Sequence, residues 1–557
     1  MVMRIQSTLL AVVFFIVVAV AFSWPLLTRL SATGVLDWTE AAATYAAARH
    51  TVLLYGQVPL WNPYLCGGYP AIGNPQTYWL SPVFLFVLLF GAVVGPKLAV
   101  PIYLVFGLLG MWRLARWLGI PDPAALVAGV VFLTSGFMGM HLAGGQFLWL
   151  TLAWVPWVFY GYLRAREHWG WLVFAAACLA MIGLEGRVNG VAYVALMLLS
   201  FGLMSDLVAT RGRRLRMVGR AGLLLVIAFG LGAWKFIPDL LFLRETVTLP
   251  EATHISAIWM LGRLLARSGR VLETYEGVTM VEYGYYVGAI PLGLAIWALF
   301  SPAIRARAAA WLFVGAMMLA VTLGGSHNIF ELLPVGSALR NPQRAMSACL
   351  FVLGLLAAWG ASRIRSRPVQ WLIITVLIVD LLSVTSPLLD HEYAKVARGD
   401  KQPPALHLPF VQDEGFDPYP AVAANRGAKS FCLTVLNAWQ RRGDVRAYLA
   451  EAYRGEAYVD RGSVVLHTHS PNRIMATVES DAGTQLIINQ NWAPGWRAAG
   501  GQPTRSASGL LGVEVPAGSH LIDLTFWPPG MTAGMVVTLL TVIILVWTVY
   551  YVQKTSR

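Results

Sequence analysis

Long runs of apolar residues recur along most of the chain, each close to the length that a helix needs to cross a bilayer. A spanning helix takes about 20 predominantly apolar residues. The pattern predicts about twelve such helices joined by polar connections. They lie near residues 8–28, 97–114, 122–140, 146–163, 169–185, 188–208, 219–241, 284–302, 308–324, 344–362, 368–388 and 531–552. The chain is therefore predicted to be an α-helical polytopic membrane protein.

A further apolar stretch at 78–95 leaves the number of crossings open, and the basic residues decide it. Pro82, Gly91 and Pro96 suit a broken helix, so we expect an interfacial or re-entrant segment rather than a full crossing. With about twelve crossings and the N-terminus inside, every basic cluster faces the cytoplasm, as the positive-inside rule requires. The clusters lie at 113–116, 164–166, 211–220, 305–307, 363–367 and 554–557.

The segment 389–529 has a different pattern. Short alternating or β-branched runs such as TQLIINQN and HLIDLTFW are separated by the turn sequences SDAG and PAGS. This predicts a small β-rich domain, a sandwich, before the last span. We expect a transmembrane domain at 1–388 with an external loop at 31–96, an extracytoplasmic β-rich domain at 389–529, and a final helix with a short cytoplasmic tail at 530–557.

Composition excludes several classes of function. The chain is 57% hydrophobic and 12% charged, with a net charge of +13. In a membrane protein this charge reflects topology first, so we expect membrane lipids and no nucleic acid as partners. There is no P-loop and no glycine-rich fingerprint of a nucleotide fold. Sugar chemistry, if present, is therefore expected outside the cytoplasm, where a lipid-borne donor replaces a nucleotide sugar.

An acidic residue follows the first span closely, in GVLDWTEAAATYAAARH. Asp37 and Glu40 have the D-x-x-E spacing of a capping box at the start of a helix over 38–55. Alternatively, Asp37 is a general base held at the membrane surface. A carboxylate can cap a helix and still accept a proton, so both interpretations stay open.

The external loop continues with LLYGQVPLWNPYLCGGYPAIGNPQT at 53–77, which is rich in proline, glycine, asparagine and aromatic residues. Rigid turns with aromatic faces and amide groups suit a polyol ligand. The alternative is a lid that packs on the membrane domain. The candidate residues for binding a sugar or acceptor are Glu40, Trp61, Asn62, Tyr69, Asn74, Gln76 and Glu185.

Several stretches together resemble a known family. Asp37 after the first span, GQVPLWNP and GGYP in the loop, LRNPQRAM at 339–346, and NWAPGWRA with GVEVPAGSHLIDLTFWPP near the end resemble the YfhO-type bacterial membrane proteins, of the GT-C class of integral-membrane glycosyltransferases. Here AAGGQPT replaces the family's usual turn after PGW. The resemblance implies that a sugar is taken from a polyprenyl-phosphate carrier outside the membrane. It also implies that an acidic residue of the first external loop is the general base, the position of Asp37.

A lipid phosphate that leaves during transfer requires cations near the outer surface. Arginine suits phosphate because its planar fork offers paired donors. The candidates for this role are Arg340, Arg344, Arg187, Arg244 and Lys235. Each has an alternative. Arg340 and Arg344 fit interface anchors, Glu185 and Arg187 fit a local ion pair, and Lys235 with Asp239 has the i, i+4 spacing of a pair on one helix face.

The sequence predicts no cofactor. The external histidines, His254 and His327, lack ligand spacing to another histidine. Glu273, Glu276 and Glu282 share one external loop and leave a divalent metal open, although we do not expect one. The four cysteines show no CxxC spacing. A disulfide between Cys66 and Cys432 outside the cell is a further alternative that the sequence does not favour.

These observations lead to one prediction with two competitors. We predict a hexosyl or pentosyl transferase of the bacterial cytoplasmic membrane, with Asp37 as its base and its site and β domain outside. Its donor is a polyprenyl-phosphate sugar, and its acceptor is a glycan, cell-envelope polymer or lipid. The competitors are a non-catalytic flippase for lipid-linked sugars and an envelope-polymer-binding assembly protein. Charges within the spans are few, Asp380 being the clearest, which favours the enzyme over a flippase.

Overall fold

The predicted multi-pass helical class is confirmed. The computed structural model describes residues 2–34, 36–208, 216–245, 256–267, 269–275, 278–323, 342–394, 410–415, 417–432, 442–499 and 502–555. Within them, nine helices are long and apolar enough to cross a membrane, and they coincide with nine of the predicted spans. The other three predicted spans hold two shorter apolar helices, Gly170–Leu184 and Ala289–Leu299, and a segment at 147–164 that is partly a 3₁₀ helix.

The helices differ widely in length. The longer ones are α1 (Val2–Leu27), α3 (Val83–Trp117), α8 (Val188–Val208), α9 (Arg216–Leu243), α12 (Pro302–Thr322), α14 (Met346–Ser362), α15 (Arg367–Ala394) and α18 (Met531–Thr555). The shorter ones are α2 (Trp38–Leu53), α4 (Ala124–Leu133), α5 (Gly136–Ala143), α6 (Val155–Arg164), α7 (Gly170–Leu184), α10 (Ala257–Arg263), α11 (Ala289–Leu299) and α16 (Pro418–Ala423). The described residues also form the 3₁₀ helices η1 (Phe147–Trp154), η2 (Met280–Tyr283) and η4 (Pro342–Ala345).

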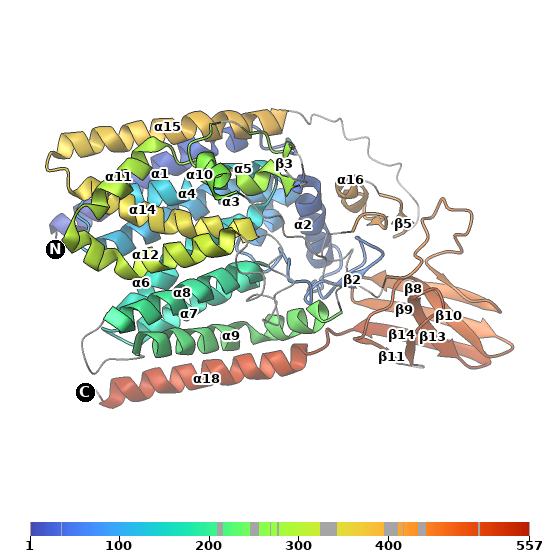
Figure 1. Ribbon diagram of the computed structural model, residues 1–557. Coiled ribbons are helices and arrows are strands. Elements are labelled where there is room, and N and C mark those ends of the chain that lie inside the picture. The colour runs from blue at the N-terminus through green and yellow to red at the C-terminus, as the bar shows by residue number, and fades with distance from the viewer. Residues whose placement is uncertain are drawn as a thin grey trace.

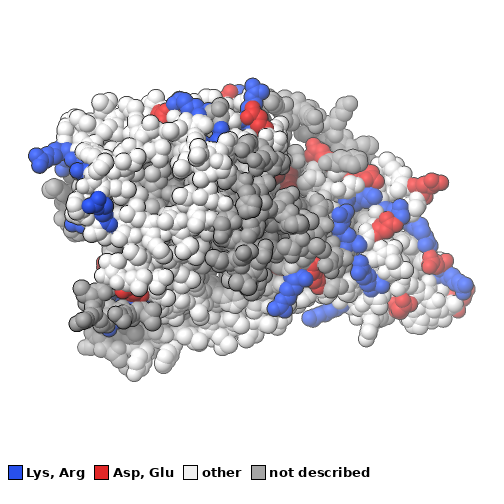
Figure 2. Space-filling model, viewed as in Figure 1, with Lys and Arg blue, Asp and Glu red and all other residues white. Residues whose placement is uncertain are grey.

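The long helices lie roughly side by side in one elongated bundle (Figure 1). A β sandwich lies at one end of the bundle, and both chain termini lie at the opposite end. On the face shown in Figure 2, charged side chains are sparse along the flank of the bundle and frequent on the sandwich. An uncharged flank is the surface that a helical bundle presents to lipid, because lipid offers no partner to a charge.

Small residues let the central helix α14 approach its neighbours closely. A Cβ added at Gly354 would lie 2.6 Å from the carbonyl oxygen of Ala128 in α4. One added at Gly360 would lie 2.0 Å from the carbonyl oxygen of Leu294 in α11. Helices in membranes associate mainly by such close packing, because lipid tails are as apolar as the helix surfaces.

Helix α3 contains the predicted break. Gly91 has φ 86° and ψ 171°, far from helical values, so Val83–Phe90 and the longer second part are two helices joined by a kink. A Cβ added at Gly95 would lie 2.6 Å from the backbone of Phe86, so the chain folds back on itself here. The broken helix expected at 78–95 is therefore present. Its position at the membrane surface stays a prediction.

The predicted β-rich domain is a sandwich of two four-stranded antiparallel sheets. One sheet has the order β12-β13-β10-β7, and the other has the order β11-β14-β9-β8. Its strands are β7 (Ala457–Tyr458), β8 (Ser463–Ser470), β9 (Arg473–Ser480), β10 (Thr484–Asn491), β11 (Trp496–Ala499), β12 (Pro503–Arg505), β13 (Leu510–Val515) and β14 (Gly518–Phe526). Three two-stranded pairs lie elsewhere, β1 (Trp61–Asn62) with β2 (Tyr69–Pro70), β3 (Thr274–Tyr275) with β4 (Val278–Thr279), and β5 (Gln412–Asp413) with β6 (Gly427–Ala428).

The first loop is built into the sandwich. The Trp61 ring is fully buried, packs against Trp496 and Phe526, and donates a hydrogen bond of 3.2 Å to Gln490. Nearby, a disulfide joins Cys66 to a cysteine 366 positions later, Cys432. The sequence did not favour this disulfide, and the structure corrects that expectation. The loop therefore fixes the sandwich to the end of the bundle.

Lys97 of α3 holds the connection that leads from α1 to Asp37. Its side chain is fully buried, and its ammonium donates hydrogen bonds to the carbonyl oxygens of Arg29, Leu30 and Ala32. These carbonyls belong to the turn that follows α1, where the Arg29 carbonyl also accepts a hydrogen bond of 3.2 Å from the Ala32 backbone. The ammonium also lies 5.4 Å from the centre of the Trp38 ring, beside Asp37. One cation thus holds the turn after α1 and the start of α2.

We expect Lys97→Met to destabilise the protein. Methionine keeps most of the side-chain volume but removes a charged donor from three half-buried carbonyls. Hydrogen bonds to a charged group are worth about 1.5–3 kcal/mol each, so Tm in detergent should fall by several degrees. Lys429→Met is the matched control, because it removes an ammonium from a more exposed pair with Glu414, worth about 0–1 kcal/mol. An equal fall in Tm for the two variants would contradict this role of Lys97.

Candidate functional site

The Asp37 side chain points away from the helix that it precedes. Its backbone angles, φ −72° and ψ 2°, are not those of an extended N-cap, and its carboxylate accepts no hydrogen bond from α2. It instead accepts one of 2.8 Å from the side-chain amide of Gln146, 109 positions away. The predicted capping box of Asp37 and Glu40 is therefore wrong. The carboxylate is oriented by tertiary structure.

A sharp turn between α5 and η1 positions Asp37. The carbonyl oxygen of Gly144 accepts a hydrogen bond of 3.1 Å from the Asp37 backbone. Gly145 has φ +81°, and a Cβ there would lie 2.4 Å from the first backbone nitrogen of α2, so only glycine allows this approach. The Trp149 indole donates a hydrogen bond of 3.0 Å to Gln146 and orients its amide toward Asp37.

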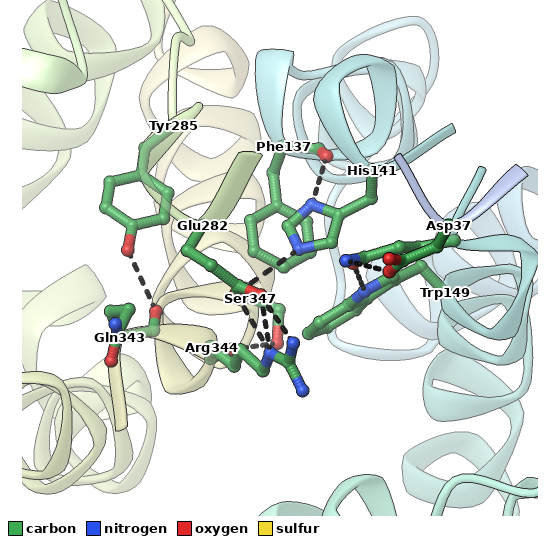
Figure 3. A network of polar contacts seen from close by, with 10 residues as sticks. Asp37, Phe137, His141, Trp149, Glu282, Tyr285, Gln343, Arg344 and Ser347 are labelled. Carbon is green, nitrogen blue, oxygen red and sulfur yellow. Dashed lines mark hydrogen bonds and ion pairs between the residues drawn. The ribbon is translucent and has the colours of Figure 1, made fainter. Parts of the chain in front are cut away.

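An ion pair between Glu282 and Arg344 faces Asp37 across the site (Figure 3). The Arg344 Nε lies 2.9 and 3.1 Å from the two carboxylate oxygens, and Nη2 donates a further bond. Burial raises the pKa of the Glu282 carboxyl, but the Arg344 guanidinium outweighs burial and holds the pKa below its ordinary value. The charge of Arg344 is therefore balanced within the protein.

His141 lies between the Glu282 carboxylate and the Trp149 ring. Its Nδ1 donates a hydrogen bond of 2.8 Å to the carbonyl oxygen of Phe137. Its Nε2 lies 3.9 Å from the Glu282 carboxylate and has no hydrogen-bond partner among the described residues. The ring packs between Phe137 and Trp149, with centroid distances of 4.1 and 4.2 Å. The His141 ring thus packs on the Trp149 indole that orients Gln146, and its Nε2 lies on the side of Glu282.

Arg187 is a buried cation near Asp37 that has no ion pair among the described residues. It is 4% exposed, and its guanidinium carbon lies 3.1 Å from the centre of the Trp149 ring. Its Nη1 has no hydrogen-bond partner within the part of the chain that the structure describes. Arg187 also lines a small cavity of about 20 Å³, together with Tyr193 and Ser347. A buried guanidinium without an anion is costly, so an anionic ligand would satisfy it.

Glu185 does not form the alternative local pair with Arg187 in the described structure. Its carboxylate accepts hydrogen bonds from the Ser81 and Tyr103 hydroxyls, both at 3.0 Å, and from the Trp154 indole at 2.8 Å. These donors come from the turn before α3, from α3 itself and from η1. They occupy the carboxylate that the sequence assigned to sugar or acceptor binding.

The two carboxyl groups at the start of α2 differ in their ease of ionisation. Burial raises the pKa of Asp37, while the hydrogen bond from Gln146 and the charge of Arg344 oppose the rise. Burial raises the pKa of Glu40 well above its ordinary value, and the charge of Asp37 adds to the rise. Burial therefore opposes ionisation of Glu40 more than that of Asp37, whose charge the Gln146 hydrogen bond and Arg344 favour.

Five residues predicted to bind a sugar or acceptor line a single cavity beside α2. They are Trp61, Asn62, Tyr69, Asn74 and Gln76. The cavity is small, with a volume of about 20 Å³. The Asn62 side-chain amide donates a hydrogen bond of 3.0 Å to the Tyr69 hydroxyl. The side-chain oxygen of Asn74 accepts a hydrogen bond of 3.0 Å from the backbone N–H of Gln76. These bonds shape the loop, as expected for the alternative of a packed lid.

The remaining predicted cations lie in different settings. Lys235 pairs with Asp239 at 2.5 Å, which confirms the predicted i, i+4 pair. The Lys235 ammonium also lies 3.5 Å from the carbonyl oxygen of Asn74 at the loop cavity. Arg244 is exposed, beyond the end of α9. Arg340 lies outside the described residues, as do His254, His327 and Glu276. Within the described ranges, no cluster of three or more histidine, cysteine, aspartate or glutamate residues could hold a metal ion.

Sequence reasoning missed His141, Gln146 and Trp149, and it assigned Glu282 only to a possible metal loop. These residues lie at the edges of apolar segments, where they look like ordinary span ends. One signal was available. Two successive glycines precede Gln146 in an apolar stretch, a combination that marks a tight backbone approach followed by a polar side chain.

Comparison with known proteins gives remote structural likenesses. The chain matches the arabinofuranosyltransferase AftD from Mycobacteria with a TM-score of 0.45 and 17% identity, covering 69% of this chain and 27% of AftD. It matches the oligosaccharyltransferase AglB from Archaeoglobus fulgidus, in complex with an inhibitory peptide and a dolichol-phosphate, with a TM-score of 0.42 and 13% identity, covering 72% of this chain and 57% of AglB. No family model and no curated protein matches the chain.

Thermal unfolding should depend on pH through Glu40. Burial holds the pKa of Glu40 above its ordinary value of 4.5 in the folded chain, so the folded state retains a proton that the unfolded chain releases. The stability that this proton gives is full below about pH 4.5 and is lost as the pH rises through the raised pKa. We expect the Tm of the wild type to fall over this range and Glu40→Gln to flatten the fall.

Glu167→Gln is the control for this pH series. Its hydrogen bonds with Arg164 lower the pKa of the Glu167 carboxyl, so it changes charge at lower pH. This variant should keep the wild-type slope above pH 4.5. If Glu40→Gln and the wild type lose Tm in parallel as the pH rises, Glu40 is already ionised in the folded protein.

Proposed function

We propose that this chain is a GT-C-type membrane glycosyltransferase, related to the YfhO-type bacterial proteins. It moves a hexosyl or pentosyl group from a polyprenyl-phosphate carrier to a glycan, cell-envelope polymer or lipid. One observation carries the proposal. The Asp37 carboxylate is turned away from its own helix and faces a site that also holds Arg344, next to the buried and unpaired Arg187.

Asp37 is the proposed general base. Burial raises its pKa, which makes the ionised carboxylate a better proton acceptor than a solvent-exposed aspartate. In the proposed step, the acceptor hydroxyl gives its proton to Asp37 while its oxygen forms a bond to the anomeric carbon of the donor sugar. The bond between that carbon and the carrier phosphate breaks, and the phosphate oxygen keeps the electron pair. Gln146 holds the carboxylate in place throughout.

Arg187 is the proposed main contact of the leaving phosphate. Its guanidinium is buried against Trp149 and is not neutralised by a carboxylate among the described residues. Arg344 shares the site but is paired with Glu282, so it contributes shape and hydrogen bonds more than net charge. Lys235 is tied to Asp239 and has a smaller part in this proposal. The contribution of Arg340 stays a prediction from the sequence.

We place the site outside the cytoplasm of a bacterium, at its cytoplasmic membrane. The Cys66–Cys432 disulfide supports this side, because disulfides persist in oxidising compartments and are rare in the cytosol. The first loop carries Cys66, and Cys432 follows the strand β6; α2, which begins after Asp37, and the sandwich lie at the end of the bundle opposite the termini. The five residues around the cavity beside α2 form the proposed acceptor side.

We expect Asp37→Asn to abolish transfer without unfolding the protein. The amide still accepts the hydrogen bond from Gln146 but takes no proton at neutral pH, and loss of a general base typically costs about 10²–10⁴-fold in rate. The assay follows sugar transfer by purified full-length protein from synthetic polyprenyl-phosphate sugars. Mass spectrometry of envelope glycans from cells with and without the protein first identifies the sugar and its acceptor.

Glu40→Gln is the matched control for the transfer assay. It changes a neighbouring carboxyl group whose ionisation burial opposes, so it should retain most of the wild-type rate. The Tm of Asp37→Asn should stay close to that of the wild type, since the Asp37 side chain does not cap α2. A folded Asp37→Asn protein that transfers sugar within a few-fold of the wild type would place the base elsewhere.

A further inference from the structure

A second polar cavity lies on the flank of the bundle, beside α5, α10 and the end of α15. Its volume is about 380 Å³, near the lower end of the range of about 300–1,000 Å³ for small-molecule sites. Met140 and Tyr286 line it, whereas their neighbours His141 and Tyr285 belong to the network around Glu282 and Arg344. The flank cavity and the network around Glu282 and Arg344 are therefore adjacent, but they have no residue in common.

Arginines line one side of this flank cavity. Arg263, Arg267 and Arg270 all contribute to it. Arg267 is held by Asp380 at 2.5 Å and by the Tyr286 hydroxyl at 2.9 Å, so it forms a fixed part of the wall. The Arg270 side chain is exposed and has no ion pair among the described residues. The cavity therefore offers guanidinium groups to an anion, and phosphate is the anion whose geometry they fit best.

The flank cavity also contains a carboxylate. Glu392 lines the cavity, is 1% exposed, and its Oε2 has no hydrogen-bond partner within the described chain. A buried carboxylate without a partner costs several kcal/mol as an ion. A purely anionic ligand would leave this cost in place. A ligand that carries a cationic group next to its phosphate would satisfy both Glu392 and the arginines.

The cavity also lies where a lipid headgroup would lie. Glu392 is in the last turn of α15, a helix that is long and apolar enough to cross a membrane. The short helix α10 and the residues after it expose Ile258 (83%), Leu261 (50%) and Leu265 (50%) next to the arginines. Such an apolar face beside basic residues is typical of a segment at the membrane surface. Figure 2 shows charges of both signs along the edge of the bundle that α15 occupies.

We propose that this flank cavity binds the headgroup of a phosphoethanolamine lipid, with its phosphate on Arg263 and Arg270 and its ammonium on Glu392. The lipid tails would lie along the apolar outer faces of α10 and α15. The site is independent of sugar transfer, because it shares no residue with Asp37, Arg187 or their partners. A phosphoethanolamine lipid would therefore be bound at the flank of the bundle, beside α10 and α15.

Native mass spectrometry of the full-length protein tests this proposal with phosphatidylethanolamine and phosphatidylglycerol of identical tails as probes. The wild type should retain phosphatidylethanolamine in preference to phosphatidylglycerol. Arg270→Gln should weaken binding of both lipids about tenfold, the loss expected for one charge-assisted contact to phosphate. Glu392→Gln should lower binding of phosphatidylethanolamine alone and so reverse the preference. Arg305→Gln, an exposed arginine of α12 outside the cavity, should change neither.

Inorganic phosphate and soluble phosphoethanolamine separate a lipid site from a site for a free anion. Neither should displace the lipid at equal concentration, since the apolar faces contribute only to binding of the whole lipid. Displacement by either would overturn the lipid assignment. Equal binding of the two lipids by the wild type, or unchanged lipid preference in Glu392→Gln, would overturn the assignment of the ammonium to Glu392.

Discussion

A charged group inside an apolar bundle must find a partner, because lipid and packed aliphatic side chains offer none. Most buried charges of this chain obey that constraint within the described residues. Lys97 binds carbonyls of the turn after α1, Lys235 pairs with Asp239, Arg344 pairs with Glu282, and Glu185 accepts three hydrogen bonds. Within the described ranges, two buried charged side chains have no ion pair and keep an atom without a hydrogen-bond partner, the Nη1 of Arg187 and the Oε2 of Glu392. These exceptions mark the two places where we propose that a ligand supplies the missing partner.

The same constraint explains why the site lies where the bundle meets the sandwich. Loop backbone and polar side chains are tolerated only where protein or water satisfies them. The first loop meets this need by joining the sandwich, through the Trp61 ring and hydrogen bonds from Asn491 to the backbone of Cys66 and Gly68. The Cys66–Cys432 disulfide ties the loop to the segment after β6. The sandwich thus anchors the loop beside α2, the helix that begins immediately after Asp37.

Features set by local pattern could be predicted from the sequence, and features set by distant contacts could not. The spans, the break at Gly91, the sandwich and the Lys235–Asp239 pair all follow from periodicity or short spacing. The capping box failed because Gln146, far along the chain, takes the Asp37 carboxylate that a local pattern assigned to α2. The disulfide was named but not favoured, and the Glu282–Arg344 pair was missed, for the same reason, since each joins residues that only the fold brings together.

The central claim is that Arg187 binds the phosphate of a lipid carrier opposite Asp37. Binding of sugar-free polyprenyl phosphate to purified protein, measured by calorimetry for the wild type, Arg187→Gln and Asp37→Asn, tests it most directly. The account predicts that Arg187→Gln loses at least tenfold in affinity, as expected for a charge-assisted contact. It predicts that Asp37→Asn binds as tightly as the wild type or more tightly, since a negative charge near the phosphate is removed. Unchanged affinity in a folded Arg187→Gln protein would contradict the account.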